Sequence, residues 1–523
     1  MTWLLLLPLL SACGKDDTSK DSPPGPLDDT TAPTTDSSDD TGGTVTGHTG
    51  QTGHTGEPVP DEFTRIAENT TDWASVGYVI EEWEHDTLMG ADGKTSPSVT
   101  WIRPAAEDQS VDGVVLYLHG STGEDDSEGN PDCPLDVAEE ARDRFIMDWD
   151  TLVHFATQRN LAVLAPVNLW CDAWMGQGPI DSDVPDHHHY GYSFIEESLD
   201  WALSSHSGVS VDGPVVAWGT SLGAIGAGLV ATRRDEVTAA VVDSGPIDLD
   251  NQLQAAFVNT LEHILGDPGT YPERYQENSL VALIEDGVLT KPLFAVTNAQ
   301  DVITHPTHGE SLQLALAAAY APNDLRYTWH DFDHPSPGST HHVQTGLPLM
   351  PTTYVTPLLL SFLLDEQHLK WVEAEDCTVC TLGEPYSTGG WAEAASRGVA
   401  IRTLVADGPG TLIQARPPAG AVNGTVSGTA VIGLDELTED VASTTIAAVV
   451  RWVVGGVIVA ERDITVGDLD HANNMPASAA QIEKSTLALP GAFTDPQTQF
   501  EVYVTGTVPM LVDAAVFSFV PEG

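Results

Sequence analysis

The sequence predicts an α/β protein with a doubly wound, mostly parallel sheet, followed by an all-β sandwich. Up to about residue 369, short apolar runs alternate with stretches of helical spacing, which is typical of parallel strands joined by helices. A Gly-x-Ser-x-Gly sequence stands between one apolar run and a helical stretch. From residue 370 on, the pattern becomes β-like, in short runs separated by Gly, Asp and Asn, and this favours a sandwich.

The elements of the first region, 61–369, follow from these runs. The early strands, of which we expect the first two to be antiparallel, are predicted at about 77–88, 98–103, 114–118 and 161–165, with helices at about 135–158 and 194–205. The later elements are strands at 215–218, 239–242, 292–297 and 325–329, a cap insertion at about 251–287, and a final helix at 354–367.

The sequence Gly219-Thr220-Ser221-Leu222-Gly223 carries the most functional information. An apolar strand precedes it and an Ala/Gly/Leu-rich helix follows, and this strand–turn–helix context is what a nucleophile elbow requires. A Cβ at Gly219 or Gly223 would clash where the strand and helix backbones approach each other. The strained turn would hold the Ser221 hydroxyl at the positive end of the helix, so Ser221 is the predicted nucleophile.

An acid and a base follow Ser221 in the order that such a site requires. Asp301 comes just after the apolar strand at 292–297, and ligand sites in open α/β sheets lie at the carboxyl ends of strands. His334 follows the last predicted strand and is the predicted base. Three histidines compete with it: His330, which we expect within the strand, and His341 and His342, which could begin the next helix.

The strand at 114–118 ends in a His119-Gly120-Ser121 turn, which predicts an oxyanion hole made by the backbone N–H groups of Ser121 and Leu222. Substrate contacts are predicted for four side chains near this edge of the sheet, although the tryptophans could instead belong to the core: His119, Trp170, Trp174 and His188. His188 is the middle of three consecutive histidines. Because these point in different directions, a polar pocket wall is favoured over a catalytic metal site.

With these motifs the chain resembles the α/β-hydrolase superfamily, most closely its prolyl-oligopeptidase and dienelactone-hydrolase-like branches. Further residues of the resemblance are Gly266-Asp267-Pro268, Pro272-Glu273-Arg274-Tyr275 and Ser279, and it covers roughly 78–367. The resemblance implies a Ser–Asp–His hydrolase that acts on esters or amides without a cofactor. We expect no propeller like the one that precedes the hydrolase domain of true prolyl oligopeptidases, because few residues precede the first predicted strands.

The first residues resemble a bacterial lipoprotein signal. An apolar run too short to span a bilayer ends in Ser11-Ala12-Cys13, so residues 1–12 would be removed and Cys13 acylated. Gly14, in place of an acidic residue, favours the outer membrane by the same resemblance. The Asp/Thr/Ser/Gly-rich segment 13–60 is predicted to be a disordered linker. We therefore expect an extracytoplasmic protein that meets the membrane only through its lipid.

The net charge of the chain limits which partners it can bind, and its cysteines indicate the compartment in which it works. The formal net charge of −57 excludes nucleic acid as a partner, because phosphate binding needs clustered cations. Four cysteines besides Cys13 fit an exported protein with disulfides: Cys133 with Cys171, and Cys377 with Cys380 in a small ring. Redox catalysis by the second pair would need a thioredoxin-like context, and a zinc site would need a second pair of ligands.

The C-terminal region, 370–523, resembles jelly-roll carbohydrate-binding modules at its two ends. Trp371-Val372-Glu373-Ala374-Glu375 is similar to their opening strand, and the segment 511–516 is similar to their closing strand. The resemblance implies a structural calcium ion held by Glu373, Glu375 and Asp513, since oxygen ligands suit this ion. It also implies sugar binding; the alternative is a sandwich that only packs against the hydrolase region.

Together these features predict a surface-tethered serine hydrolase that cleaves carboxylic esters through an acyl-enzyme. The substrate would be a small ester, a peptide or an acylated polysaccharide. Three alternatives stay open: a serine peptidase of the prolyl-oligopeptidase type, a polysaccharide deacylase, and a hydrolase-fold protein that binds without catalysis.

Overall fold

The computed structural model describes residues 63–69, 76–88, 96–106, 109–120, 155–168, 174–175, 190–249, 261–262, 265–297, 301, 304–319, 327–331, 363–364, 368–374, 382–386, 400–418, 421, 423–434, 441–469 and 482–520. The predicted signal peptide, Cys13 and the linker lie outside these residues. So do the four remaining cysteines, Cys133, Cys171, Cys377 and Cys380. The lipid anchor and the disulfides therefore stay predictions.

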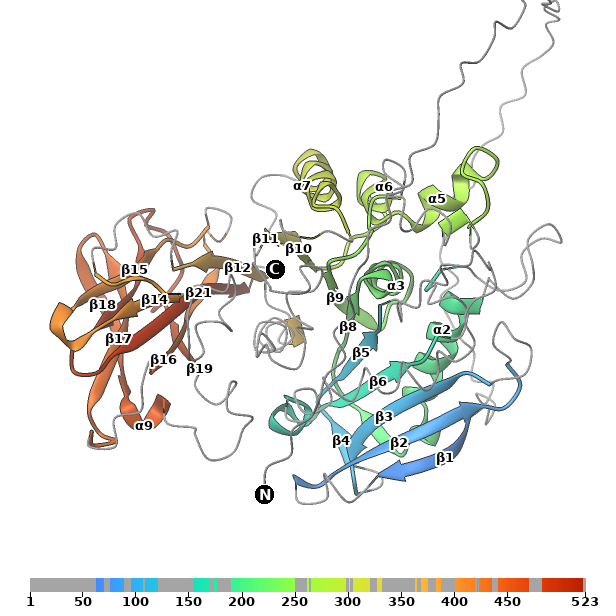
Figure 1. The fold of residues 1–523 in the computed structure, drawn as a ribbon, viewed down its shortest axis with the longest axis horizontal. Coiled ribbons are helices and arrows are strands. Elements are labelled where there is room, and N and C mark those ends of the chain that lie inside the picture. Colours follow the sequence, from blue (N-terminus) through green and yellow to red (C-terminus); the bar gives the residue numbers. More distant parts are fainter. Residues whose placement is uncertain are drawn as a thin grey trace, which may run out of the picture. The chain divides into compact units, whose positions relative to one another are not determined.

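Nine strands of the described residues form one mixed sheet (Figure 1). In chain order they are β1 (Phe63–Asn69), β2 (Tyr78–His85), β3 (Ser98–Pro104), β5 (Val114–Leu118), β6 (Ala162–Pro166), β8 (Val215–Thr220), β9 (Val237–Asp243), β10 (Leu293–Thr297) and β11 (Tyr327–Asp331). Their order across the sheet is β1-β2-β3-β6-β5-β8-β9-β10-β11. The first strands, up to the β3–β6 pair, are antiparallel, and from β6 to β11 all pairs are parallel.

The centre of this sheet is apolar on both faces because helices cover it. Every residue of β5, β6 and β8 is buried, which explains why these strands appear in the sequence as continuous apolar runs. The helices described here are α2 (Tyr190–Ala202), α3 (Leu222–Arg233), α5 (Pro272–Asn278), α6 (Leu280–Glu285) and α7 (Thr307–Ala319). The arrangement is the predicted doubly wound α/β-hydrolase fold.

Helix α3 runs directly from the elbow and contacts β5, β8 and β9 (Figure 1). Its Gly- and Ala-rich sequence allows this close approach. A Cβ added to Gly226 would meet the Trp174 side chain at 2.6 Å, and one added to Gly228 would meet Leu280 at 2.4 Å. Small residues in α3 therefore set the distance between the helix that follows Ser221 and its neighbours.

Several elements were not predicted. The edge strand β1 is largely exposed, so it lacks an apolar signal. A short parallel pair, β4 (Gln109–Val111) with β7 (Val209–Val211), and the 3₁₀ turn η3 (Ser205–Ser207) were also missed. So was α7, which packs on α6 and contacts β10 and β11. Of the predicted cap, the described part holds α5 and α6; of the predicted final helix, Leu363 and Leu364 are described and helical.

The C-terminal region consists of antiparallel sheets, as predicted (Figure 1). Its elements are β12 (His368–Glu373), β13 (Glu384–Tyr386), β14 (Ala400–Thr403), η6 (Val405–Asp407), β15 (Gly410–Ala415), β16 (Thr425–Leu434), β17 (Ile446–Val454), β18 (Val457–Thr465), α9 (Val466–Leu469), β19 (Ile482–Ala488), β20 (Gln499–Val504) and β21 (Met510–Val520). One sheet has the order β13-β14-β21-β16-β19, with β12 also paired to β21; the other has the order β15-β20-β17-β18.

An apolar core lies between these two sheets. Trp452 of β17 contacts the Phe517 ring of β21, with ring centroids 6.0 Å apart, and donates to the carbonyl oxygen of Leu487 in β19 at 2.9 Å. A Cβ on Gly428 of β16 would meet the Phe500 ring at 2.5 Å, so the sheets touch closely there. Within the described ranges, no helix combines the length and hydrophobicity needed to cross a membrane.

Candidate active site

Ser221 occupies the sharp turn between β8 and α3. Its backbone angles are φ 52° and ψ −121°, a conformation that costs a non-glycine residue free energy and is retained where the surrounding structure enforces it. The surroundings do so here: the Ser221 N–H donates to the carbonyl oxygen of Asp243 at 2.8 Å, and the residue is buried. The strained turn expected from the sequence is therefore present.

The two glycines of the motif are required by close backbone contacts. A Cβ on Gly219 would lie 2.0 Å from the carbonyl oxygen of Gly223, and a Cβ on Gly223 would lie 2.1 Å from the carbonyl oxygen of Leu118. Both distances are far inside van der Waals contact with backbone that cannot move aside. The predicted clash at both positions is confirmed, and the elbow is locked between β8, α3 and the end of β5.

The His119-Gly120 turn lies against Ser221. A Cβ on Gly120 would stand 2.8 Å from the Ser221 Cβ and 3.6 Å from its Oγ, so this turn reaches the hydroxyl only because it has no side chain there. Leu222 is the first residue of α3, so its N–H has no acceptor within the helix. Ser121, the other predicted oxyanion donor, lies outside the described residues.

His119 and Trp174 hold this turn in place. The His119 Nε2 accepts the Asn168 N–H at 3.0 Å, so its Nδ1 carries the proton and donates to the Gly120 carbonyl oxygen at 2.7 Å. Trp174 is fully buried in the core and donates to the His119 carbonyl oxygen at 2.7 Å. Of the two roles that the sequence left open for Trp174, the structure places it in the core.

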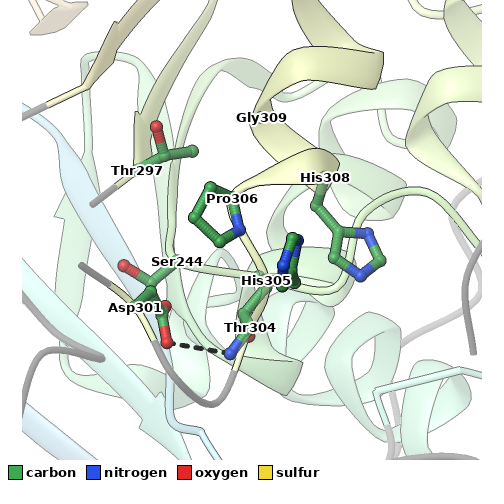
Figure 2. A pocket seen from close by; sticks show the side chains of 9 residues that line it. Ser244, Thr297, Asp301, Thr304, His305, Pro306, His308 and Gly309 are labelled. Carbon is green, nitrogen blue, oxygen red and sulfur yellow. Dashed lines mark hydrogen bonds between the residues drawn. The ribbon is translucent and has the colours of Figure 1, made fainter. Parts of the chain in front are cut away.

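Asp301 follows β10, at the same edge of the sheet as Ser221. Its carboxylate is buried, and its Oδ1 accepts the Thr304 N–H at 2.9 Å (Figure 2). Asp243, at the end of the neighbouring strand β9, is a second buried carboxylate at this edge; its Oδ1 accepts a hydrogen bond from the Ser244 Oγ at 2.8 Å. The sequence predicts a catalytic role for Asp301 alone.

The strand that leads to the predicted base is β11. It pairs in parallel with β10, with His330 opposite Val296 and Asp331 opposite Thr297. His330 therefore lies within the strand, as expected, and the chain leaves β11 beside the loop that carries Asp301. His334, His341 and His342 lie outside the described residues, and so do Trp170 and His188.

A small cavity beside Asp301 brings together residues that the sequence did not point to: Ser244, Gly245, Thr297, Thr304, His305, Pro306, His308 and Gly309 (Figure 2). His308 is buried on the first turn of α7, and its Nδ1 accepts the Asp248 N–H at 3.1 Å. Burial lowers the pKa of His308 to about 4, although the Asp248 carboxylate acts in the opposite direction. The His-x-x-His spacing of His305 and His308 was the sequence signal that could have drawn attention to this turn.

In the comparisons, no protein-family model and no curated protein matches the chain. Solved structures do match. An S-formylglutathione hydrolase from Agrobacterium tumefaciens is 16% identical, with 51% of this chain and 89% of that chain covered and a TM-score of 0.34. Esterase B from Lactobacillus Rhamnosis is 16% identical (55% and 86% covered, TM-score 0.39).

An acetyl xylan esterase from Paenibacillus sp. R4 is also 16% identical, with 58% of this chain and 88% of that chain covered and a TM-score of 0.36. These neighbours are esterases and hydrolases. The doubly wound fold is evident from the strand order and the elbow geometry described above.

Proposed function

We propose that this protein is a serine hydrolase that cleaves carboxylic esters through an acyl-enzyme. The observation that carries the proposal is Ser221, held at φ 52° and ψ −121° at the start of α3 with Gly120 against it. Strained residues of this kind cluster at active sites and ligand sites. An elbow serine beside a backbone turn that can offer N–H groups is the arrangement that acyl transfer requires.

In the proposed mechanism the Ser221 Oγ attacks the ester carbonyl while His334 takes its proton. His334 then returns the proton to the leaving alkoxide, and water later resolves the acyl-enzyme by the same route. Asp301 orients the imidazole and stabilises its charged form. The N–H groups of Ser121 and Leu222 stabilise the oxyanion. None of these steps calls for a cofactor.

A fluorophosphonate probe tests the proposal directly. The wild-type protein should be labelled at Ser221 and the Ser221→Ala variant should not. A panel of p-nitrophenyl esters of different acyl length, acetylated xylan and aminoacyl anilides then separates an esterase from a polysaccharide deacylase and from a peptidase. A protein that neither reacts with the probe nor cleaves any of these substrates would be a binding protein with this fold.

We predict that Asp301→Asn lowers kcat by about four orders of magnitude, because an amide neither orients the base in the required tautomer nor stabilises its charge. Asp243→Asn is the matched control at the next strand end. It leaves intact the backbone carbonyl that accepts the Ser221 N–H, so its loss of kcat should be far smaller. Steady-state kinetics on one p-nitrophenyl ester compare the two variants. The reverse ranking would move the acid to the end of β9.

For the C-terminal region we propose a structural calcium ion held by Glu373, Glu375 and Asp513. Asp513 is fully buried, and it is the extra residue of a β-bulge in β21, since Ala514 pairs with Val431 and Val512 with Ile432. Its carbonyl oxygen accepts the Ala374 N–H at 2.8 Å, so the backbone flanked by the two glutamates runs beside it. Three carboxylates would be an oxygen donor set that suits this ion. The Glu373 side chain and Glu375 lie outside the described residues.

We predict that calcium raises the melting temperature of this region by about 5–10 °C relative to a chelator, because an ion at a hundred times its Kd stabilises the native state by about 2.7 kcal/mol. Differential scanning calorimetry of the whole protein measures the shift. Asp513→Asn should abolish the response, while Asp463→Asn, at an exposed position of β18, should keep it. Equal melting in calcium and chelator would contradict the site.

A further inference from the structure

The cavity beside Asp301 has the size and the lining of a site for one water molecule. The space open to the centre of a water is about 10 Å³, which is about what one molecule needs. Several of its lining residues carry polar side chains, among them Asp301, Thr304 and His308 (Figure 2). A water in such a cavity needs two to four polar partners, and this lining can supply them.

Two of the lining side chains carry polar atoms that are buried and have no hydrogen-bond partner among the described residues. These atoms are the His308 Nε2 and the Thr304 Oγ1, in residues that are 3% and 5% exposed. Buried polar atoms in native proteins are satisfied by protein or by ordered water. Both atoms belong to residues that line one cavity, so one bound water is the partner that the structure points to.

The hydrogen bonds around His308 fix its tautomer. Its Nδ1 accepts the Asp248 N–H at 3.1 Å, so the proton of the neutral ring is on Nε2, and Nε2 is a donor toward its surroundings. The titratable groups that act on the ring are Asp248 from the loop after β9, Asp301 from the loop after β10, and His305 on its own segment. Burial dominates over all three and keeps the ring neutral at neutral pH.

Thr304 connects this water site to Asp301. Its backbone N–H donates to the Asp301 Oδ1 at 2.9 Å, while its Oγ1 is buried and has no hydrogen-bond partner among the described residues. A water that accepts from the His308 Nε2–H and bonds to the Thr304 hydroxyl completes a chain from the Asp248 backbone to the Asp301 carboxylate. This chain joins the loop after β9 to the loop after β10.

We propose that His308 is a positioning residue for Asp301: through one water bound in this cavity and through Thr304, it fixes the carboxylate that orients the base. The proposal rests on the proposed function, in which Asp301 is the acid of the triad. An error of about 1 Å in the position of such a group costs about a hundredfold in rate. Loss of this link should therefore lower kcat although it changes only a few atoms.

The test uses Thr304→Val, which keeps the backbone N–H and removes the hydroxyl, beside Thr304→Ser, which keeps the hydroxyl. Thr304→Val and His308→Ala, each as a single variant, should lose about 10- to 100-fold in kcat, with KM within about twofold of the wild type. Thr304→Ser and Gln313→Ala, an exposed position on α7, should match the wild type. If His308→Ala does not fold, the Thr304 pair alone decides.

The pH profile separates positioning from loss of stability. A displaced Asp301 stabilises the imidazolium of the base less, so the acid limb of kcat/KM should move to lower pH in Thr304→Val. A variant that melts at a lower temperature but keeps the wild-type kcat and acid limb would overturn the proposal.

A second readout does not use activity. In the Ser221→Ala protein, ¹⁵N NMR should show His308 with a bare Nδ1, a protonated Nε2 and a titration near pH 4. A ring protonated on Nδ1, or one that titrates near pH 6.5, would overturn the proposal. Failure of the proposed function is a different result: the wild type would show no Ser221-dependent hydrolysis, whatever the state of His308.

Discussion

Ser221→Ala is expected to lower kcat by about a million-fold while the protein stays folded. The triad acts as a unit, so removal of the nucleophile leaves only the rate supplied by binding and by the oxyanion hole. The substitution removes one atom and keeps the Cβ at the same backbone angles. It leaves the Ser221 N–H bonded to the Asp243 carbonyl oxygen, so the elbow should be preserved.

The measurement is turnover of a p-nitrophenyl ester, with the melting temperature as the check on folding. Ser198→Ala is the matched control, because Ser198 is also a buried serine, in α2, with its Oγ bonded to the Phe194 carbonyl oxygen at 2.6 Å. That variant should keep wild-type kcat. Near-wild-type hydrolysis by the Ser221→Ala protein would show that another residue is the nucleophile.

His334→Ala is expected to lose activity to about the same degree as Ser221→Ala. The base and the nucleophile act as a unit, so removal of either one costs about as much as removal of both. His334 follows the end of β11 by three residues in the sequence. Strand β11 ends at Asp331, opposite Thr297 at the end of β10, so the chain that leads to His334 starts beside the chain that leads to Asp301.

Three other histidines provide the controls for this prediction. His330→Ala, within β11, and His341→Ala and His342→Ala, further along the chain, should each keep most of the activity. The kinetics of all four variants on one ester rank them. Severe loss in His341→Ala or His342→Ala together with an active His334→Ala protein would assign the base to the later pair.

The parts of the fold that were predicted are those whose cause is local. β5, β8 and β10 are buried on both faces, so each appears as an apolar run. The elbow was recognised because two backbone contacts demand glycine at fixed positions on either side of Ser221. Strand β11 ends two residues later than predicted, at Asp331 and not at residue 329, which is the usual uncertainty of an element end.

The parts that were missed depend on contacts between distant segments. Strand β16 carries Thr, Ser and Gly in its sequence and is nonetheless buried along most of its length. It lies between β19 and β21 in its sheet, and its apolar side chains pack in the cores formed with distant strands. His308 is one of 18 histidines, and its buried ring accepts a hydrogen bond from the backbone N–H of Asp248, in the loop after another strand. Nothing in its own neighbourhood specifies that partner.

The contact between Gly223 and the Leu118 carbonyl oxygen has a consequence for refolding. The two residues are far apart in the chain and meet only when β5 and β8 lie side by side, and parallel pairings of this kind form slowly. Ser221 is expected to reach its strained conformation only within that finished sheet. After dilution from denaturant, ester cleavage should therefore recover only when the β5–β8 pairing has formed. Collapsed intermediates that already hold much of their secondary structure should be inactive.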